Sequence, residues 1–130
     1  MMNIHESAED YLETILVLNK RLGQVRSIDI VNEMEFSKPS VSVAMKKLRE
    51  NGYIEMDGNL YITLTDAGRE IAERIYARHR LLQKVLMAIG VGEKEAAAEA
   101  CGIEHHISEE TYNCINRYYN EHIAKEEAAQ

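Results

Sequence analysis

The chain has 130 residues, a net charge of −7 and a hydrophobic content of 45%, which fits one compact domain or a small domain with an appendage. One proline and seven glycines argue against long disordered stretches. No apolar run approaches the roughly 18 residues of a membrane span, and the N-terminus lacks the basic and apolar segments of a signal peptide. We therefore expect a cytoplasmic protein with no membrane partner, in which Cys101 and Cys114 are core residues or metal ligands rather than a disulfide.

Charge is distributed unevenly along the chain. Residues 36–52 carry four bases and one acid, a local charge of +3, whereas residues 92–130 carry nine acids and three bases, a local charge of −6. A basic segment in an acidic chain suits a protein that contacts phosphates with one element. An ordinary solvated helix face would carry the same charges, so charge alone leaves both interpretations open.

Three helices are predicted in the N-terminal part of the chain. Each starts at a serine that can act as its N-cap, namely Ser7, Ser27 and Ser37. Apolar residues at helical spacing extend the helices over residues 7–23, 27–34 and 37–52. The third also has Pro39 in its first turn, where proline is favoured.

The pattern then alternates at residues 53–56 and 60–63, and Asp57-Gly58-Asn59 between them is a strong hairpin turn. Helical spacing returns in three further segments, which are expected over residues 65–90, 93–101 and 108–119, followed by a frayed tail. Two short helices, a basic third helix and a tight hairpin have the order of a winged helix-turn-helix. The expected fold is therefore mainly α, with a two-stranded β wing.

The third helix is the expected reading helix, because a helix fits the major groove and its N-terminal residues meet the base edges. Hydroxyl groups there can bond phosphates or bases, apolar groups can contact thymine methyls, and lysines further along suit phosphates. The expected DNA contacts are Ser37, Lys38, Pro39, Ser40, Ser42, Val43, Lys46 and Lys47. Many winged helices only join proteins, and the topology alone leaves that alternative open.

A thiol, a carboxylate and an imidazole recur at helical spacing in Cys101, Glu104 and His105. If this segment is helical, all three side chains lie on one face and form a mixed sulfur, oxygen and nitrogen site for a transition metal. His106 points about 100° away from His105 and is not counted as a ligand. A core role for the cysteine and histidines remains the alternative.

Five segments match a known family in order and spacing. They are EDYLETI at 9–15, SKPSVS at 37–42, LTDAG at 64–68, RHRLL at 78–82 and CGIEHH at 101–106. With these segments the chain resembles the metal-dependent repressors of the diphtheria toxin repressor family, most closely their short manganese-repressor branch.

The resemblance implies a homodimer that reads a pseudo-palindromic double-stranded DNA operator. It also implies a winged DNA-binding domain over residues 1–72 and a helical dimerisation and metal-binding domain over residues 73–130. The implied metal ligands are Asp10, Glu13, His79, Cys101, Glu104 and His105.

This ligand set is a hybrid of two branches of the family. At position 101 the manganese branch usually has a carboxylate, whereas this chain has Cys101, as the iron branch does. At position 10 the iron branch usually has methionine, whereas this chain has Asp10, as the manganese branch does. Carboxylates suit Mn(II) or Fe(II), and a thiolate favours softer ions. We expect Fe(II) or Mn(II) as the physiological metal, with Co(II), Ni(II) or Zn(II) able to substitute.

The resulting hypothesis is a metal-activated transcriptional repressor of metal-uptake or homeostasis genes. Two other classes remain open. One is a winged-helix regulator that responds to a small organic ligand. The other is a metalloenzyme with Glu104 as its base, against which the absence of an HExxH helix, a P-loop or Ser-His-Asp spacing argues.

Overall fold

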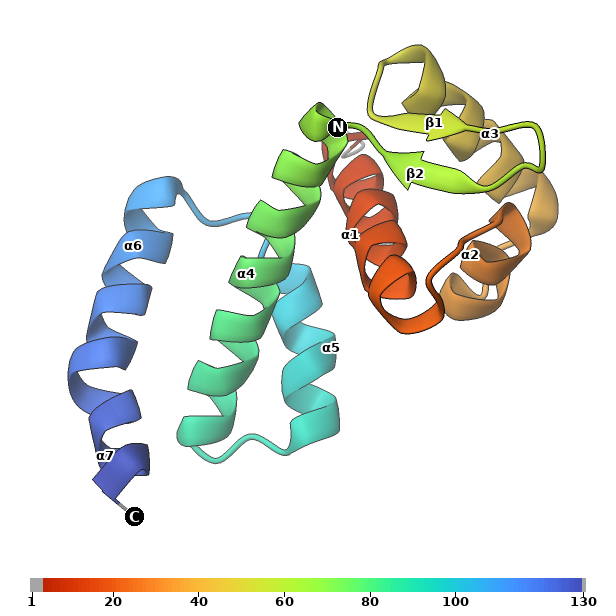
Figure 1. Ribbon diagram of the computed structural model, residues 1–130. Coiled ribbons are helices and arrows are strands. Elements are labelled where there is room, and N and C mark those ends of the chain that lie inside the picture. The colour runs from red at the N-terminus through yellow and green to blue at the C-terminus, as the bar shows by residue number, and fades with distance from the viewer. Residues whose placement is uncertain (1–3, 130) are drawn as a thin grey trace. The chain divides into compact units, whose positions relative to one another are not determined.

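A computed structural model describes residues 4–129 (Figure 1). The chain folds into two compact units, Met1–Ile75 and Tyr76–Gln130. The elements are α1 Ile4–Leu22, α2 Ser27–Met34, α3 Lys38–Glu50, β1 Ile54–Met56, β2 Ile62–Leu64, α4 Asp66–Ala88, α5 Glu93–Ile103, α6 Glu109–Tyr118, a π-helical turn Tyr119–Ile123 and α7 Ala124–Ala129. This confirms the mainly helical fold with a two-stranded wing. Within residues 4–129, no helix is both long and apolar enough to cross a bilayer.

The first unit is a winged helix-turn-helix, and two of its three predicted N-caps are wrong. Helix α1 begins at Ile4 rather than at Ser7, because residues 4–6 contain no helix breaker. Helix α2 is capped at Arg26, whose backbone N–H donates to the Asp29 carboxylate at 2.9 Å. The predicted cap of α3 is confirmed, since the Ser37 hydroxyl accepts a hydrogen bond from the Ser40 N–H at 3.2 Å.

The wing is a two-stranded antiparallel hairpin, in which Ile54 pairs with Leu64 and Met56 with Ile62. The Asp57 carboxylate closes its turn by accepting hydrogen bonds from the backbone N–H groups of Asn59 and Tyr61. Strand β2 begins two residues later than its alternation predicted, because the turn continues to Leu60, which adopts a positive φ of 66°.

The core of the first unit combines residues of every helix and both strands. Helix α1 supplies the largest share, and α3 turns only one face inward. The larger side chains that are fully buried in the core of this unit are Leu12, Ile15, Leu16, Leu18, Val25, Ile30, Val41, Met45, Ile54, Ile62 and Ile75. This packing fixes α3 on the unit and leaves its opposite face in solvent.

Gly68 lies where α4 crosses the base of the wing, and it is buried. A Cβ atom at this position would overlap the backbone carbonyl of Tyr53. That carbonyl already accepts the Thr65 N–H at 3.1 Å, so it cannot move away without breaking a hydrogen bond.

We expect Gly68→Ala to lower the free energy of unfolding by about 1–3 kcal/mol, the usual cost of overpacking. Urea unfolding in chelator measures this. Gly58→Ala is the matched control, because a Cβ there meets nothing within 4 Å. Equal stability of the two variants would contradict the close approach at Gly68.

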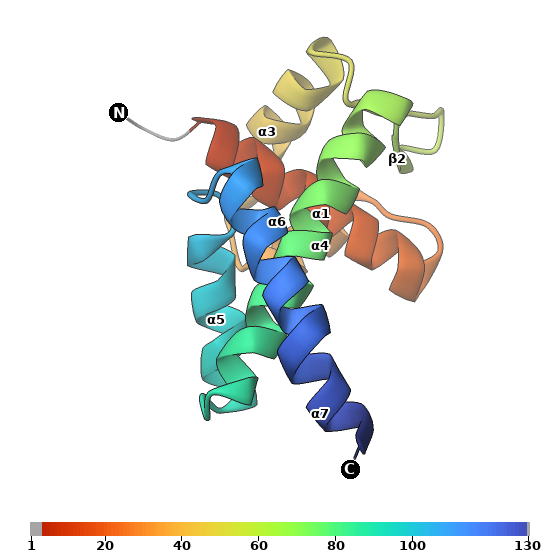
Figure 2. The same ribbon diagram turned by 90° about the vertical axis from the view of Figure 1, so that its left-hand side faces the viewer.

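The second unit consists of the C-terminal half of α4 with α5 on one side and α6 on the other (Figures 1 and 2). Its chain end differs from the predicted frayed tail, since helix α7 reaches Ala129, while Gln130 lies outside the described residues. Across the π-helical turn, the Tyr119 hydroxyl donates a hydrogen bond to Glu127 at 2.8 Å, which raises the pKa of Tyr119.

The apolar core of this second unit is thin. Its buried apolar residues, among those described, are Leu81, Leu82, Ala96 and Ala100. Two charged residues, Arg78 and Glu104, are buried with them. Burying a charge is costly unless the charge is paired, so Arg78 and Glu104 are candidates for a functional role.

Candidate metal centre and nucleic-acid interface

Glu104 occupies the end of α5, where it caps the helix in a helical conformation and its N–H bonds the Ala100 carbonyl. Because the helical geometry continues through this residue, the expected convergence with Cys101 and His105 occurs. One ligand atom from each of these three side chains lies within 4.8 Å of the other two. Cys101 is half-buried, whereas the side chain of His105 is only 1% exposed.

His79 approaches the same carboxylate from α4. Its Nδ1 lies 3.0 Å from Oε2 of Glu104, and its side chain is 21% exposed. Within the second unit, four of the six sequence-predicted ligands thus gather around the Glu104 carboxylate, namely His79, Cys101, His105 and Glu104 itself. Each carboxylate oxygen of Glu104 faces a different imidazole, since Oε1 lies 3.4 Å from Nε2 of His105.

The environment of Glu104 fits a cation. Its side chain is fully buried, and Oε1 has no hydrogen-bond partner among the described residues, because the approach of His105 lacks hydrogen-bond geometry. A buried acceptor without a partner costs about 1–3 kcal/mol. The His79 and Glu104 ligand atoms are 3.0 Å apart, which is an ordinary hydrogen-bond distance and is also the spacing of about 3 Å between adjacent ligands of an octahedral ion with bonds of about 2.1 Å.

Asp10 and Glu13, the other two predicted ligands, lie on α1 in the first unit. They are one turn apart, so they share a helix face, and both are half-buried. Tyr11 lies between them in the sequence and is a neutral phenol, and burial raises its pKa further above the ordinary value of 10.0. Its ring instead packs edge-on against Phe36 at 5.9 Å.

Sequence reasoning assigned no role to Arg78, whose guanidinium is buried beside the ligand cluster. It donates hydrogen bonds to the backbone carbonyls of Glu104 and Ile107 and to the carboxylate of Glu109. No signal in the sequence points to these contacts, because two of the three acceptors are backbone atoms.

The predicted DNA contacts all lie on the exposed face of α3 or at its cap. Every one of the eight residues is exposed, and Val43 is 54% exposed despite being apolar. The opposite face of the helix is buried through Val41, Met45 and Leu48. Helix α3 therefore presents serines, an apolar side chain and lysines together, as a reading helix requires.

Two of the serine hydroxyls are already in use at the start of this helix. Ser37 Oγ and Ser40 Oγ lie 2.8 Å apart, and Ser37 also accepts the Ser40 N–H. Ser42, in contrast, is exposed within the helix, one turn before Lys46. The cap holds the first turn in place, and the remaining exposed side chains of α3 face solvent.

Two family profiles together match almost the whole chain. The profile described as "Iron dependent repressor, N-terminal DNA binding domain" matches residues 3–60. The profile described as "Iron dependent repressor, metal binding and dimerisation domain" matches residues 65–128. The first match covers the elements from α1 to β1, including the exposed α3, and the second covers the cluster of Cys101, Glu104 and His105.

Curated relatives and solved structures agree with these matches. The chain is 33% identical to the transcriptional regulator MntR of Escherichia coli O157:H7 over 120 residues, covering 92% of this chain and 77% of that protein. It is 36% identical to the HTH-type transcriptional regulator MntR of Geobacillus kaustophilus over 111 residues, covering 85% of this chain and 77% of the relative.

Among solved structures, the chain is similar to a manganese-dependent transcriptional repressor in complex with manganese. The TM-score is 0.79 at 30% identity, and the match covers 87% of this chain and 52% of the other. This chain therefore spans about half the length of that solved protein.

Proposed function

This chain belongs to the iron-dependent repressor family as a metal-dependent, DNA-binding transcriptional repressor, and we propose that its activating metal is held by ligands from both of its units. The proposed ligands are Asp10, Glu13, His79, Cys101, Glu104 and His105. The observation that carries the proposal is the fully buried carboxylate of Glu104, with an imidazole facing each oxygen and the Cys101 thiol close by.

Either oxygen of Glu104 would be available as a ligand to a bound ion. Oε2 lies beside His79, and Oε1 lies beside His105. A carboxylate with different partners on its two sides can hold two ions, or one ion through either oxygen. On this proposal, Asp10 and Glu13 supply the further oxygen ligands that hard divalent cations require.

The identity of the metal depends on Cys101, because it is the one soft donor in an otherwise hard set. We propose Mn(II) or Fe(II) as the physiological ion, with Co(II), Ni(II) or Zn(II) able to substitute. Thiolate ligation strengthens binding of the softer ions most.

Cys101→Ala is therefore expected to lower affinity for Co(II) and Zn(II) by about 10- to 100-fold, and affinity for Mn(II) by less. The half-buried thiol adds little to the core, so the fold should persist in chelator. Competition titrations against a chelating dye measure the affinities, and circular dichroism measures the fold. Unfolding of the variant without metal would identify Cys101 as a core residue instead.

The DNA-binding role is assigned to α3 of the first unit. Serines, Pro39 and Val43 at the start of the helix would meet base edges, and Lys46 and Lys47 would contact phosphates. A homodimer with two such helices would read a pseudo-palindromic operator with half-sites about one helical turn apart, or a multiple of that. We further propose a cytoplasmic protein with a regulatory rather than a catalytic role.

The proposed ligands on α1, Asp10 and Glu13, would couple metal binding to DNA binding. Helix α1 provides the largest share of the core beneath the reading helix, so a constraint on Asp10 or Glu13 acts on the unit that carries α3. If Asp10, Glu13 and Glu104 are ligands of one metal centre, a divalent cation would supply the positive charge that balances their carboxylates. The thin apolar core of the second unit also suggests that metal and a second protomer add to its stability.

The test of the proposal is metal analysis of protein purified under reducing conditions, followed by equilibrium dialysis against Mn(II) and Fe(II) in the absence of oxygen. We expect at least one tightly held divalent ion per chain, lost on chelation and restored by either metal. Protein that takes up neither ion would overturn the proposed metal centre while leaving the winged DNA-binding unit intact.

A further inference from the structure

Arg78 is a buried cation immediately before His79 on α4. The residue is 4% exposed, and its guanidinium lies in the second unit with the ligand cluster. The side chains of consecutive residues point about 100° apart around a helix. Arg78 and His79 nevertheless both reach Glu104, at different parts of that residue. His79 contacts the Glu104 carboxylate, while Arg78 contacts the Glu104 backbone.

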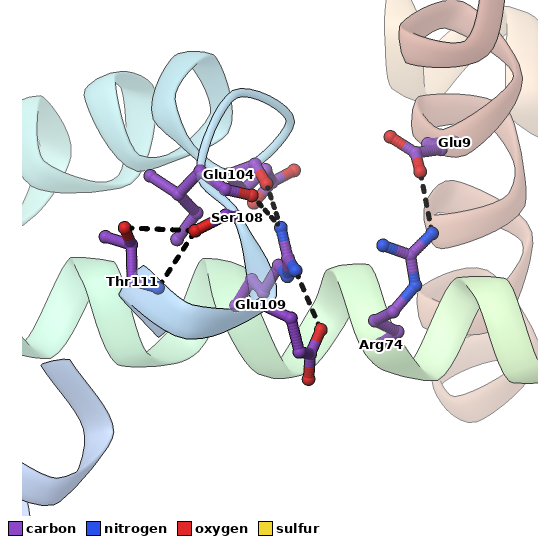
Figure 3. A network of polar contacts seen from close by, with 8 residues as sticks. Glu9, Arg74, Glu104, Ser108, Glu109 and Thr111 are labelled. Atoms are coloured by element: carbon purple, nitrogen blue, oxygen red, sulfur yellow. Dashed lines mark hydrogen bonds and ion pairs between the residues drawn. The ribbon is translucent and has the colours of Figure 1, made fainter. Parts of the chain in front are cut away.

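The contacts of Arg78 bracket the connection between α5 and α6. Its Nη1 donates to the carbonyl of Glu104 at 3.2 Å and to the carbonyl of Ile107 at 2.7 Å. These carbonyls stand at the two ends of the short segment that also contains His105. A single guanidinium therefore ties both ends of the ligand-bearing segment to α4. Two of the residues that it contacts, Glu104 and Glu109, are labelled in Figure 3, where dashed lines mark hydrogen bonds and ion pairs.

The other end of the guanidinium is neutralised on α6. Nη2 donates to the Glu109 carboxylate at 3.0 Å, and the Tyr112 ring lies 5.5 Å from the guanidinium carbon. The Glu109 carboxylate balances the positive charge of Arg78. Arg78 can therefore bind the Glu104 backbone without adding an uncompensated positive charge next to a cation site. Its Nε is buried without a hydrogen-bond partner among the described residues, so the three bonds from Nη1 and Nη2 hold it in place.

We propose that Arg78 is a positioning residue for the metal centre, which holds the backbone of Glu104 and His105 so that their side chains converge with His79. This inference rests on the proposed metal-binding function. Outer-sphere groups that orient ligands commonly change metal affinity by about 10- to 100-fold. Lysine cannot replace Arg78, because an ammonium lacks the planar fork of donors that reaches two carbonyls and a carboxylate together.

The experiment compares Mn(II) and Co(II) binding by the full chain and three variants. Arg78→Lys keeps the charge and removes the fork, and its expected affinity loss is about 10- to 100-fold. Arg80→Lys is the matched control, since Arg80 flanks His79 on the other side and is exposed. Its affinity should equal that of the wild type. The Co(II)–thiolate charge-transfer band reports whether Cys101 still coordinates in each protein.

Glu109→Gln separates positioning from simple ion pairing. It leaves both carbonyl contacts of Arg78 in place and removes an ion pair whose carboxylate is 65% exposed. We expect an affinity loss of only about threefold, the scale of an exposed ion pair. A loss as large as that of Arg78→Lys would overturn the proposal, because the ion pair and not the backbone clamp would then control affinity.

The remaining outcomes are also decisive. Wild-type affinity and an unchanged Co(II) band in folded Arg78→Lys would overturn the positioning role. If Arg78→Lys does not fold in chelator, Arg78→Gln carries the test, because it removes the buried charge together with the fork of donors. Wild-type Mn(II) affinity in that variant contradicts the proposal. Failure of the wild-type chain itself to bind Mn(II) or Co(II) would instead refute the proposed function, which keeps the two conclusions distinguishable.

Discussion

Glu104→Gln is expected to lower the affinity for Mn(II) by more than about 100-fold, because changes outside the ligand shell already cost about 10- to 100-fold. The variant removes the carboxylate that faces both His79 and His105. Glutamine has a similar shape but no negative charge, and its amide oxygen is a weaker ligand for a hard cation. Metal-dependent DNA binding should disappear with the affinity. Titration with Mn(II) and a DNA-binding assay measure the two effects.

The same variant separates a metal ligand from a structural carboxylate. In chelator, Glu104→Gln keeps an acceptor for His79, so we expect the free energy of unfolding to remain within about 1 kcal/mol of the wild-type value. Glu99→Gln is the control, since Glu99 is exposed on the same helix. If Glu104→Gln unfolded in chelator, or if both variants bound Mn(II) equally, Glu104 would not be the central ligand.

Val43→Glu is expected to reduce DNA affinity by at least about tenfold, since a base contact is worth about 1–3 kcal/mol. Val43 is 54% exposed on α3, beside the serines and lysines of the predicted interface. The new carboxylate removes an apolar contact and faces the phosphates with a negative charge. Glutamate has a higher helix propensity than valine, so the fold and the metal affinity should be unchanged.

Leu22→Glu provides the matched control for that substitution. Leu22 is 50% exposed at the end of α1 and outside the predicted DNA contacts. Fluorescence anisotropy with a duplex selected from random-sequence DNA in the presence of Mn(II) compares the two variants. Equal binding by Val43→Glu and wild type would mean that α3 does not enter the groove and would favour a winged helix that joins proteins.

Helix α3, the proposed reading helix, is the element that local sequence predicts best. Its cap, its first-turn proline and its apolar spacing all act within a few residues, and the structure has the helix where these signals place it. The predictions of N-caps at Ser7 and Ser27 are wrong because the local signal there is ambiguous. Serine is acceptable inside a first turn as well as before it, so the start of a helix depends on where the chain becomes extended.

The candidate metal centre is only partly readable from sequence. Helical spacing brings Cys101, Glu104 and His105 together because they are neighbours in the chain. The approach of His79 and the complete burial of Glu104 depend on the packing of α4 against the end of α5. Arg78 could not be predicted at all, since its acceptors lie 26 to 31 residues away and two of them are backbone carbonyls.

The end of the chain shows the same limit. From the sequence we expect fraying at residues 125–130, yet the helix continues through the π-helical turn to Ala129. The hydrogen bond between Tyr119 and Glu127 joins side chains eight positions apart across that turn. A bond over this separation depends on the course of the whole helix, so a local sequence pattern does not reveal it.

The measurement that tests the central claim most directly is the affinity of the wild-type chain for its selected duplex in chelator and with added Mn(II) or Fe(II). Coupling between two sites is typically about 1–3 kcal/mol, so we expect metal to tighten DNA binding by about 5- to 150-fold. Chelation should reverse the gain. Equal DNA affinity with and without metal, in protein shown to bind the ion, would contradict the account.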